Sequence, residues 1–390
     1  MSPDEIKSLQ KAIYAEGLDG WLFCNFRHRD FLADELLGLS SKTSNSRLWI
    51  YAIPAKGKAR KILHKVEPLA LEGLSGEEDF YVSRRELAAI LKSLAGKSWG
   101  VQVSENLPAI SYLDAGTAAF FRKAGLKLVS AAGLIQRSKA LLDEKAIASH
   151  ERSSVQLYGI VDEAWKKVKS AYHSRKPVWE GDLRSFILSE IKHRGLYADH
   201  EPIVAAGPNA GNPHYDFSGR GAKIRGGDVI QFDLWAKEKN DKAIYADISW
   251  AGFFGTDIPP LIEKNFSDLV SAREGALAFI EDEFRQGSRP SGAMVDRKAR
   301  DILIKKGYRE NLKHRTGHGI DTEVHGSGVN IDSVEFPDER LLLDGSCFSL
   351  EPGIYFKDRG FRTEIDVYIS RGKPVVSGKS RKRQFTLLLC

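Results

Sequence analysis

The sequence predicts an α/β protein of two domains, each with its own sheet flanked by helices. The chain has 390 residues, 42% of them hydrophobic, which is enough material for two ordinary cores. Strand-like and helical segments alternate through the first third of the chain. A long amphipathic stretch at about 141–172 then separates this third from a strand-rich remainder. We therefore predict one domain at residues 1–138 and a second at residues 139–390.

The first third of the chain predicts an α/β domain. Its sequence contains no motif that indicates a catalytic or binding site. We expect an opening helix, a strand at 20–23 and a strand at 48–53. The segment 54–58 contains Pro and Gly, so the strand at 48–53 and the segment 60–64 should form a hairpin. A strand at 99–103 and a helix at 112–124 complete this region.

The second domain should begin with two helices and continue with strands. Apolar residues with helical spacing predict helices at 141–172 and 179–194. Segments rich in Val, Ile, Phe, Tyr and Trp then predict strands at 228–236, 244–252, 346–356 and 362–370. A helix-rich interruption spans about 259–307.

Composition argues against a membrane protein and against a nucleic-acid-binding protein. The first twenty residues carry acids where a signal peptide needs bases, and they lack a long apolar run, so we expect a cytoplasmic protein with no membrane contact. The net charge of +6 arises from 58 basic and 52 acidic residues, a thin excess without a clear basic face. We interpret the one dense basic run, at 379–383, as a solvated tail. The three cysteines form no CxxC pair, and we expect small buried residues or part of a loose terminus.

Acidic residues interrupt the predicted apolar strands of the second domain. Asp233 and Asp247 each lie between large apolar neighbours, and the polar segment 237–242 between them predicts a hairpin that brings both to one surface. Glu351 and Glu364 repeat this arrangement in the last two strands. His318 lies between the two pairs, in a glycine-containing segment that lets the backbone approach other groups closely. A single acid of this kind is commonly explained by a salt bridge or an edge position, but the five residues together favour a site.

Four carboxylates in one core would repel each other and become protonated unless positive charge neutralises them. Two divalent metal ions would supply +4 against −4, and one imidazole would complete an oxygen-rich ligand set. Such a pair of metals, about 3.5–4 Å apart, suits a bridging hydroxide that attacks a carbonyl. Mostly carboxylate ligands with one nitrogen and no sulfur favour manganese, with cobalt and zinc as alternatives. The predicted reaction class is metal-assisted hydrolysis.

The order Asp, Asp, His, Glu, Glu, set in FDLWAKEKNDKAIYADISW, TGHGIDTEVHG, SLEPGIY and FRTEIDVYI, resembles the pita-bread (M24) metallopeptidases. The motifs cover about 200–370, and the preceding region resembles the creatinase-like domain of the Xaa-Pro dipeptidase (prolidase) and aminopeptidase P branch. The resemblance implies a pita-bread domain with a curved, mainly antiparallel sheet flanked by helices. It also implies a homodimer.

The resemblance assigns roles to individual residues. Asp233, Asp247, His318, Glu351 and Glu364 would be the metal ligands, with Asp247 and Glu364 bridging and Glu351 also shuttling the proton. His325 would steady the tetrahedral intermediate, and His214 would meet the scissile carbonyl or the leaving group. His314 and Arg362 would line the pocket for the proline side. For His214, a simple turn-capping role is the alternative.

This chain departs from the family pattern at several positions. The two aspartates are 14 residues apart (247 minus 233) instead of the usual 11, which predicts a longer hairpin turn. Ser249 and Trp250 replace the usual Thr-Arg, and Ile365 stands where an acid is frequent. No ligand is lost, so these departures concern the substrate pocket.

We predict an Xaa-Pro exopeptidase that acts on small peptides with proline at the second position, most readily on dipeptides, because Arg362 and the histidines could grip a free carboxylate. Aminopeptidase P activity on longer Xaa-Pro-Yaa peptides is the first alternative. A metal-free pita-bread binding module and a creatinase-like amidinohydrolase are the others, and the full ligand set argues against both.

Overall fold

The computed structural model describes residues 1, 3–379 and 387–390, which form two compact units at 1–139 and 140–390. The sequence predicted a boundary between residues 138 and 139. Of the basic run at 379–383, residues 380–383 lie outside the described residues, so the solvated tail stays a prediction. Within the described chain, no helix has the length and apolar character that a membrane crossing requires.

The first unit is a six-stranded mixed sheet with helices on both faces. The strands lie in the order β4-β3-β2-β1-β5-β6, with antiparallel pairs β1–β2 and β2–β3 and parallel pairs elsewhere. Alternate residues of β1 and β2 face opposite cores, as the period of two requires: Trp21 and Phe23 pack on one side and Leu22 and Ile50 on the other. The elements are α1 Pro3–Ala15, β1 Gly20–Asn25, α2 Phe31–Leu37, β2 Trp49–Pro54, β3 Arg60–His64, β4 Glu77–Tyr81, α3 Arg84–Lys92, β5 Ser98–Val101, α4 Ala115–Lys123, β6 Lys127–Ser130 and α5 Ala132–Ile135.

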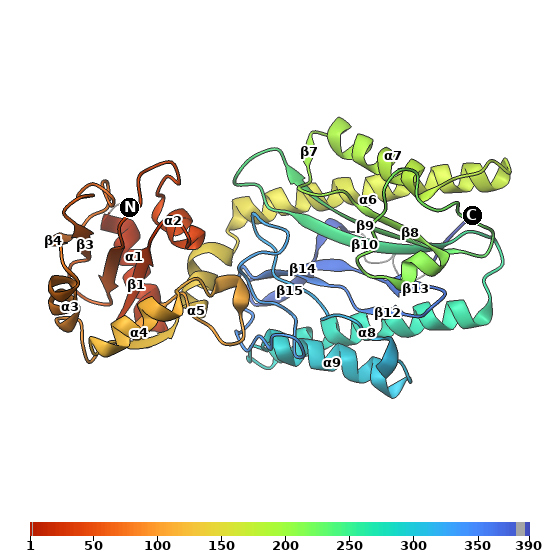
Figure 1. Ribbon diagram of the computed structural model, residues 1–390. Coiled ribbons are helices and arrows are strands. Elements are labelled where there is room, and N and C mark those ends of the chain that lie inside the picture. Colours follow the sequence, from red (N-terminus) through yellow and green to blue (C-terminus); the bar gives the residue numbers. More distant parts are fainter. Residues whose placement is uncertain (2, 380–386) are drawn as a thin grey trace. The chain divides into compact units, whose positions relative to one another are not determined.

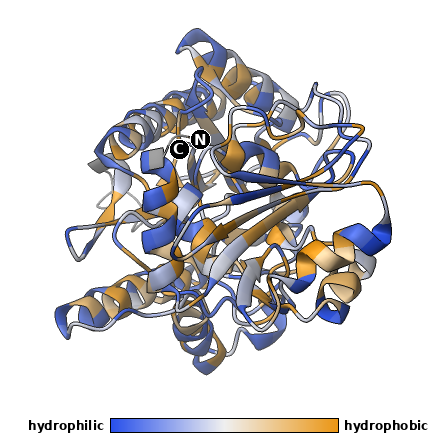
Figure 2. Cartoon of the chain, turned by 90° about the vertical axis from the view of Figure 1, so that its left-hand side faces the viewer, coloured by the Kyte–Doolittle hydropathy of each residue, from blue (hydrophilic) through white to orange (hydrophobic). Residues whose placement is uncertain are grey.

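The second unit places strands between two pairs of helices (Figure 1). Its helices are α6 Glu144–His173, α7 Glu180–His193, α8 Pro260–Arg285 and α9 Gly292–Lys305. Its strands are β7 Leu196–Tyr197, β8 Ile203–Ala206, β9 Val229–Glu238, β10 Ala246–Phe253, β11 Cys347–Leu350, β12 Gly353–Tyr355, β13 Gly360–Arg362, β14 Ile365–Ser370, β15 Lys373–Val376 and β16 Leu388–Leu389. Helices carry both blue and orange stretches in Figure 2, as expected of amphipathic helices with one face on a sheet.

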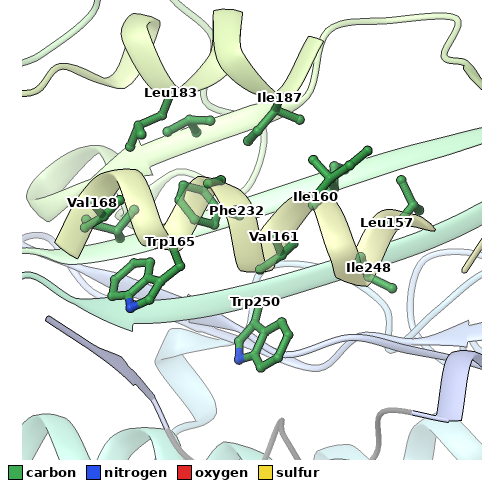
Figure 3. Packing of buried hydrophobic residues seen from close by; sticks show 14 of the residues in the cluster. Leu157, Ile160, Val161, Trp165, Val168, Leu183, Ile187, Phe232, Ile248 and Trp250 are labelled. Carbon is green, nitrogen blue, oxygen red and sulfur yellow. The ribbon is translucent and has the colours of Figure 1, made fainter. Parts of the chain in front are cut away.

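The β9–β10 hairpin turns one face to helix α6. Phe232 and Leu234 of β9, with Ile248 and Trp250 of β10, belong to the core that α6 and α7 cover (Figure 3). The alternate residues of both strands point to the opposite face, where the predicted aspartates lie. Both faces of the hairpin are therefore buried, which explains why these strands are apolar almost throughout.

The β11–β14 pair repeats this design against the other two helices. Phe348, Leu350, Ile365 and Val367 pack on α8 and α9, so their neighbours Ser349 and Asp366 face the opposite side. A backbone hydrogen bond joins the two hairpins: Glu364 N–H donates to the Ser249 carbonyl at 3.1 Å. The inner faces of the two hairpins thus form one polar region between layers of helix-covered strand.

Several predicted elements differ from the observed ones. The strand expected at 362–370 starts at the last residue of β13, is interrupted at 363–364 and continues as β14. The strand expected at 346–356 is divided into β11 and β12, because Pro352 has no N–H to donate to the ladder. The helix expected from residue 112 begins at Ala115, where the Asp114 side chain accepts a hydrogen bond from Thr117 N–H at 3.0 Å and caps the first turn.

Candidate metal centre

The β9–β10 register brings the two aspartates to the inner face. Asp233 lies opposite Ser249, and Asp247 lies opposite Trp235, so all four side chains share that face. The ladder runs from Val229–Phe253 to Ala236–Ala246, and the longer spacing of the aspartates is accommodated in the turn beyond it. Both aspartates are buried.

The two glutamates occupy the break between two short ladders. Ser349 pairs with Asp366 in one ladder and Gly353 pairs with Arg362 in the other, and both pairs belong to the same register. Glu351 and Glu364 therefore face each other at the interruption. Arg362, Glu364 and Asp366 alternate along the chain and share the inner face.

His318 reaches the site from an irregular strand beside β11. Ser349 N–H donates to the His318 carbonyl at 2.9 Å, and the Ser349 hydroxyl accepts from His318 N–H at 3.0 Å. A side chain at Gly317 would overlap the Ser349 carbonyl, and one at Gly319 would lie 2.8 Å from Gly328 Cα. The flanking glycines therefore permit the close approach that the sequence predicted.

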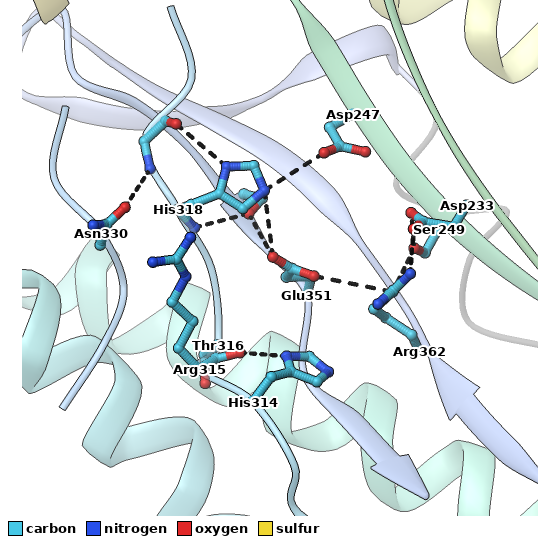
Figure 4. Close-up of polar contacts among 12 residues, drawn as sticks. Asp233, Asp247, Ser249, His314, Arg315, Thr316, His318, Asn330, Glu351 and Arg362 are labelled. Carbon is cyan, nitrogen blue, oxygen red and sulfur yellow. Dashed lines mark hydrogen bonds and ion pairs between the residues drawn. The ribbon is translucent and has the colours of Figure 1, made fainter. Parts of the chain in front are cut away.

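Figure 4 shows His318 between Asp247 and Glu351. His318 Nε2 lies 3.5 Å from Asp247 Oδ2 and 3.4 Å from Glu351 Oε1. One ligand atom each from Asp247, His318 and Glu364 lie within 4.8 Å of one another. The structure thus brings Asp247, His318 and Glu364 together, with Glu351 beside His318, while Asp233 shares the inner face and is bonded to Arg362.

The chemistry of this donor set fits divalent metal ions. Burial, followed by the neighbouring carboxylates, raises the pKa of Asp247 and Glu364 well above the usual range for acids, while burial lowers the pKa of His318 and leaves its ring neutral. Asp247 Oδ1 is buried and has no hydrogen-bond partner among the described residues. A cation would satisfy that oxygen and the neutral imidazole together.

Arg362 lies deeper in the site than a substrate-gripping residue would. Its Nη2 bonds Asp233 Oδ2 directly, its Nε donates to the Ser249 hydroxyl at 2.9 Å, and it lies 3.9 Å from Glu351 Oε2. Nη1 donates to the Pro213 carbonyl over a longer distance, 3.5 Å. The guanidinium therefore balances Asp233, and a role in substrate binding stays a prediction for Nη1 alone.

The three histidines predicted outside the ligand set lie in different surroundings. The His325 ring packs edge-on against His318, with ring centroids 4.3 Å apart; the repulsion between the two rings when both are protonated, together with burial, lowers the pKa of His325 to about 3. His314 Nε2 lies 2.8 Å from the Tyr355 hydroxyl. His214 is exposed on the loop after β8, and its charge contributes to the lowered pKa of both other histidines. Their catalytic roles stay predictions.

Sequence reasoning missed the residues that hold the ligands in place. The Ser249 hydroxyl donates to Asp233 Oδ1 at 2.6 Å, and Asp366 Oδ2 accepts Asp247 N–H at 2.9 Å. Each lies two residues beyond a ligand, so the strand period could have identified both. Glu180, at the start of α7, gave no such signal. It is fully buried and binds the loop that carries His214.

Known proteins that resemble this chain include dipeptidases. The probable dipeptidase PepE of Mycobacterium tuberculosis is 25% identical over 348 residues, which cover 86% of this chain and 84% of that protein. The Xaa-Pro dipeptidase of Lactobacillus helveticus is 34% identical over 169 residues, which cover 43% of this chain and 41% of that protein.

Solved structures with different functions share the fold. The dipeptidase PepE of Mycobacterium ulcerans matches with a TM-score of 0.70 at 22% identity, over 99% of this chain and 97% of that chain. The N-terminal domain of the FACT complex subunit SPT16 from chickpea matches with a TM-score of 0.64 at 14% identity, over 98% of each chain.

The family profile described as Metallopeptidase family M24 matches residues 156–371, which is more than half of the chain and includes every predicted ligand. The chain belongs to metallopeptidase family M24.

Proposed function

We propose that this protein is a dinuclear metal-dependent exopeptidase that hydrolyses Xaa-Pro bonds, most readily in dipeptides. The observation that carries the proposal is the convergence of four carboxylates and one neutral imidazole on the inner faces of two hairpins. The names of the relatives, probable dipeptidase and Xaa-Pro dipeptidase, support the choice of substrate.

Asp233, Asp247, His318, Glu351 and Glu364 would hold two metal ions, with manganese favoured by the oxygen-rich set. When bound, the ions lower the pKa of water and polarise the scissile carbonyl. The side chains of the protein would orient the substrate and transfer a proton.

Glu351 is best placed to transfer the proton. Its side chain is 12% exposed and lies at the break in the hairpin. The leaving nitrogen of proline has no hydrogen in the peptide and must gain one when the bond breaks. We infer that the Glu351 carboxylate takes a proton from water and delivers it to that nitrogen.

His325 and His314 would act on opposite sides of the scissile bond. A neutral His325 keeps one ring N–H, which can donate to the carbonyl oxygen as negative charge develops there. The His314–Tyr355 pair would border the proline ring. A side chain at Gly353 would overlap the Tyr355 hydroxyl and lie 2.7 Å from His314 Nε2, so glycine at this position makes room for the pair.

A panel of Xaa-Pro dipeptides and Xaa-Pro-Yaa tripeptides, assayed with manganese, cobalt or zinc, tests substrate length and metal together. We expect release of free proline from dipeptides, fastest with manganese. Cleavage of tripeptides alone would favour the aminopeptidase P alternative. No hydrolysis by fully metal-loaded protein would refute the proposed function.

A further inference from the structure

The side chain of Trp235 lies on the same inner face as the predicted metal ligands, next to them along the β9–β10 ladder. It lies two residues after Asp233 on β9 and directly opposite Asp247 across the ladder, so its side chain shares their face. Its indole Nε1–H donates to Asp199 Oδ1 at 2.7 Å. Asp199 comes from the connection between β7 and β8, and this bond holds its carboxylate beside the site.

The Asp199 carboxylate is negatively charged and partly exposed to solvent. Its second oxygen lies 2.9 Å from His200 Nδ1, and its side chain is 26% exposed. Although burial alone would raise the pKa of Asp199, the hydrogen bonds from Trp235 and His200 lower it, so the group is ionised at neutral pH. Its charge also contributes to the pKa values of Asp247 and His325, which places it within electrostatic reach of both.

The Asp199–Trp235 pair lies away from the proline side of the proposed site. Figure 4 shows His314 and Asp247 on opposite sides of Glu351. Trp235, across the ladder from Asp247, packs in the cluster that includes Ile320 and Val324, on the segment that leads to His325. A substrate with its proline ring at His314 would therefore place the preceding residue toward Trp235.

Neighbouring charges leave Asp199 available for a ligand. Lys237, the nearest cation along β9, donates to the Thr322 carbonyl at 2.7 Å and lies over the Tyr245 ring. It forms no ion pair with Asp199 among the described residues. His200 is mostly exposed, so its contact with Asp199 is open to solvent.

We propose that Asp199, held in place by Trp235, binds an ammonium group on the residue that precedes proline. This inference rests on the proposed function and adds a recognition element for the substrate's cationic end. The ammonium could be the free α-amino group or the side chain of an N-terminal lysine. Either ammonium group would form an ion pair with the Asp199 carboxylate. The neutral indole N–H of Trp235 holds this carboxylate in position, and it is partly shielded from water.

Asp199→Asn removes the charge while keeping an oxygen acceptor for Trp235. Glu201→Gln is the matched control, because Glu201 lies on the same connection, is exposed and pairs with Arg184 on α7. Alanyl-proline is compared with lactoyl-proline, in which a hydroxyl replaces the amine. Lysyl-proline is compared with norleucyl-proline, which lacks only the side-chain charge.

If Asp199 binds the α-amino group, Asp199→Asn should reduce the alanyl-to-lactoyl ratio of kcat/KM about tenfold, the scale of a charge-assisted bond at a partly exposed site. If it binds a lysine side chain, the lysyl-to-norleucyl ratio should fall instead. Metal content should not change. The inference is overturned if neither ratio changes, or if Glu201→Gln has the same effect. Absence of hydrolysis by the wild type in all four assays would instead refute the proposed function, and the inference would fall with it.

Discussion

Asp247 has a buried oxygen, Oδ1, with no hydrogen-bond partner in the part of the chain that the structure describes, and burial and nearby carboxylates raise its pKa. Replacement by asparagine keeps the shape and removes the charge that a cation needs. We expect Asp247→Asn to abolish metal retention and peptidase activity while the protein stays folded, because the neutral amide resembles the protonated acid. Elemental analysis, an activity assay and circular dichroism would check this.

Asp241→Asn, in the exposed turn between β9 and β10, is the control and should keep both metal and activity. Full activity in Asp247→Asn would refute the assigned site.

His325 offers a test that separates catalysis from metal binding. It packs against His318 but lies outside the proposed ligand set. We expect His325→Ala to lower kcat by about 10²–10³, the usual cost of removing a donor to a developing oxyanion, with metal content unchanged. His193→Ala, on the exposed end of α7, should have no effect. Loss of metal with the rate retained would show that the assigned role is wrong.

For individual residues, the sequence predicted which side chains lie close together but not which hydrogen bonds and ion pairs each of them forms. The alternation of acids with apolar residues was sufficient to identify Asp233 and Asp247. It could not show that Arg362 forms an ion pair with Asp233, because this pair depends on the contact between two hairpins far apart in sequence. Asp199 was missed for the same reason, since its contact with Trp235 joins separate segments.

The loop 206–222 is held by the side chain of one buried residue, Glu180. Both Glu180 carboxylate oxygens accept hydrogen bonds from it: Oε1 from Ala206 N–H and the Asn209 amide, both at 2.9 Å, and Oε2 from the Tyr215 hydroxyl at 3.1 Å and Ala222 N–H at 2.7 Å. One buried acid thus ties the start, middle and end of the segment that carries His214.

Glu180→Gln should lower the free energy of unfolding by about 1–3 kcal/mol, because an amide NH2 would replace the acceptor that faces two donors. It should also lower kcat/KM if His214 contacts substrate. Urea unfolding and steady-state kinetics would measure both effects. Asp182→Asn, on the same helix in an exposed pair with Arg220, should change stability by less than about 0.5 kcal/mol. Equal effects of the two variants would contradict this role for Glu180.

Element types were predictable where the apolar period was strong, as in α6, β9 and β10. Element ends were not, because they depend on local events such as the Asp114 cap and the interruption at Pro352. The edge strands β4 and β6 carry polar and exposed residues and gave no clear period.

For the whole molecule, the overall architecture does not by itself determine activity. The chain shares its fold with PepE and with a domain of SPT16, so the functional argument must rest on the ligand set. That set also predicts a pH dependence of stability in metal-free protein, since folding then buries acids that hold their protons.

Burial raises the pKa of Asp247 in the folded state, whereas in the unfolded chain it should titrate near the usual value of about 4. Above that pH the folded state binds more protons, so the contribution of Asp247 to stability is complete below about pH 4 and is lost as the pH rises through the raised pKa. His318 contributes with the opposite sign, because burial lowers its pKa. Both metal-stripped wild type and metal-stripped Asp247→Asn contain His318, so its contribution cancels when the two proteins are compared.

We expect stripped wild type to lose stability relative to stripped Asp247→Asn between pH 5 and pH 8, by up to about 1.4 kcal/mol per pH unit. Added manganese should reverse the difference by stabilising the wild type alone. Urea unfolding at four pH values, with chelator or metal, would test this. A difference independent of pH would show that Asp247 is not a buried acid in the metal-free fold.

The common register on both sides of Pro352 limits how this chain can change in length. A deletion or insertion of one residue between Glu351 and Gly353 would turn Glu351 toward the helices, because side chains alternate at every position of a strand. The turn at 356–359 lies beyond the strand pairs and is closed by the Phe356 N–H bond to the Arg359 carbonyl at 2.8 Å, so a change of length at its tip does not shift the register of the acids. Relatives that keep the activity should therefore differ in loop length at such turns, while the segments that join the acids to their ladders keep a fixed number of residues.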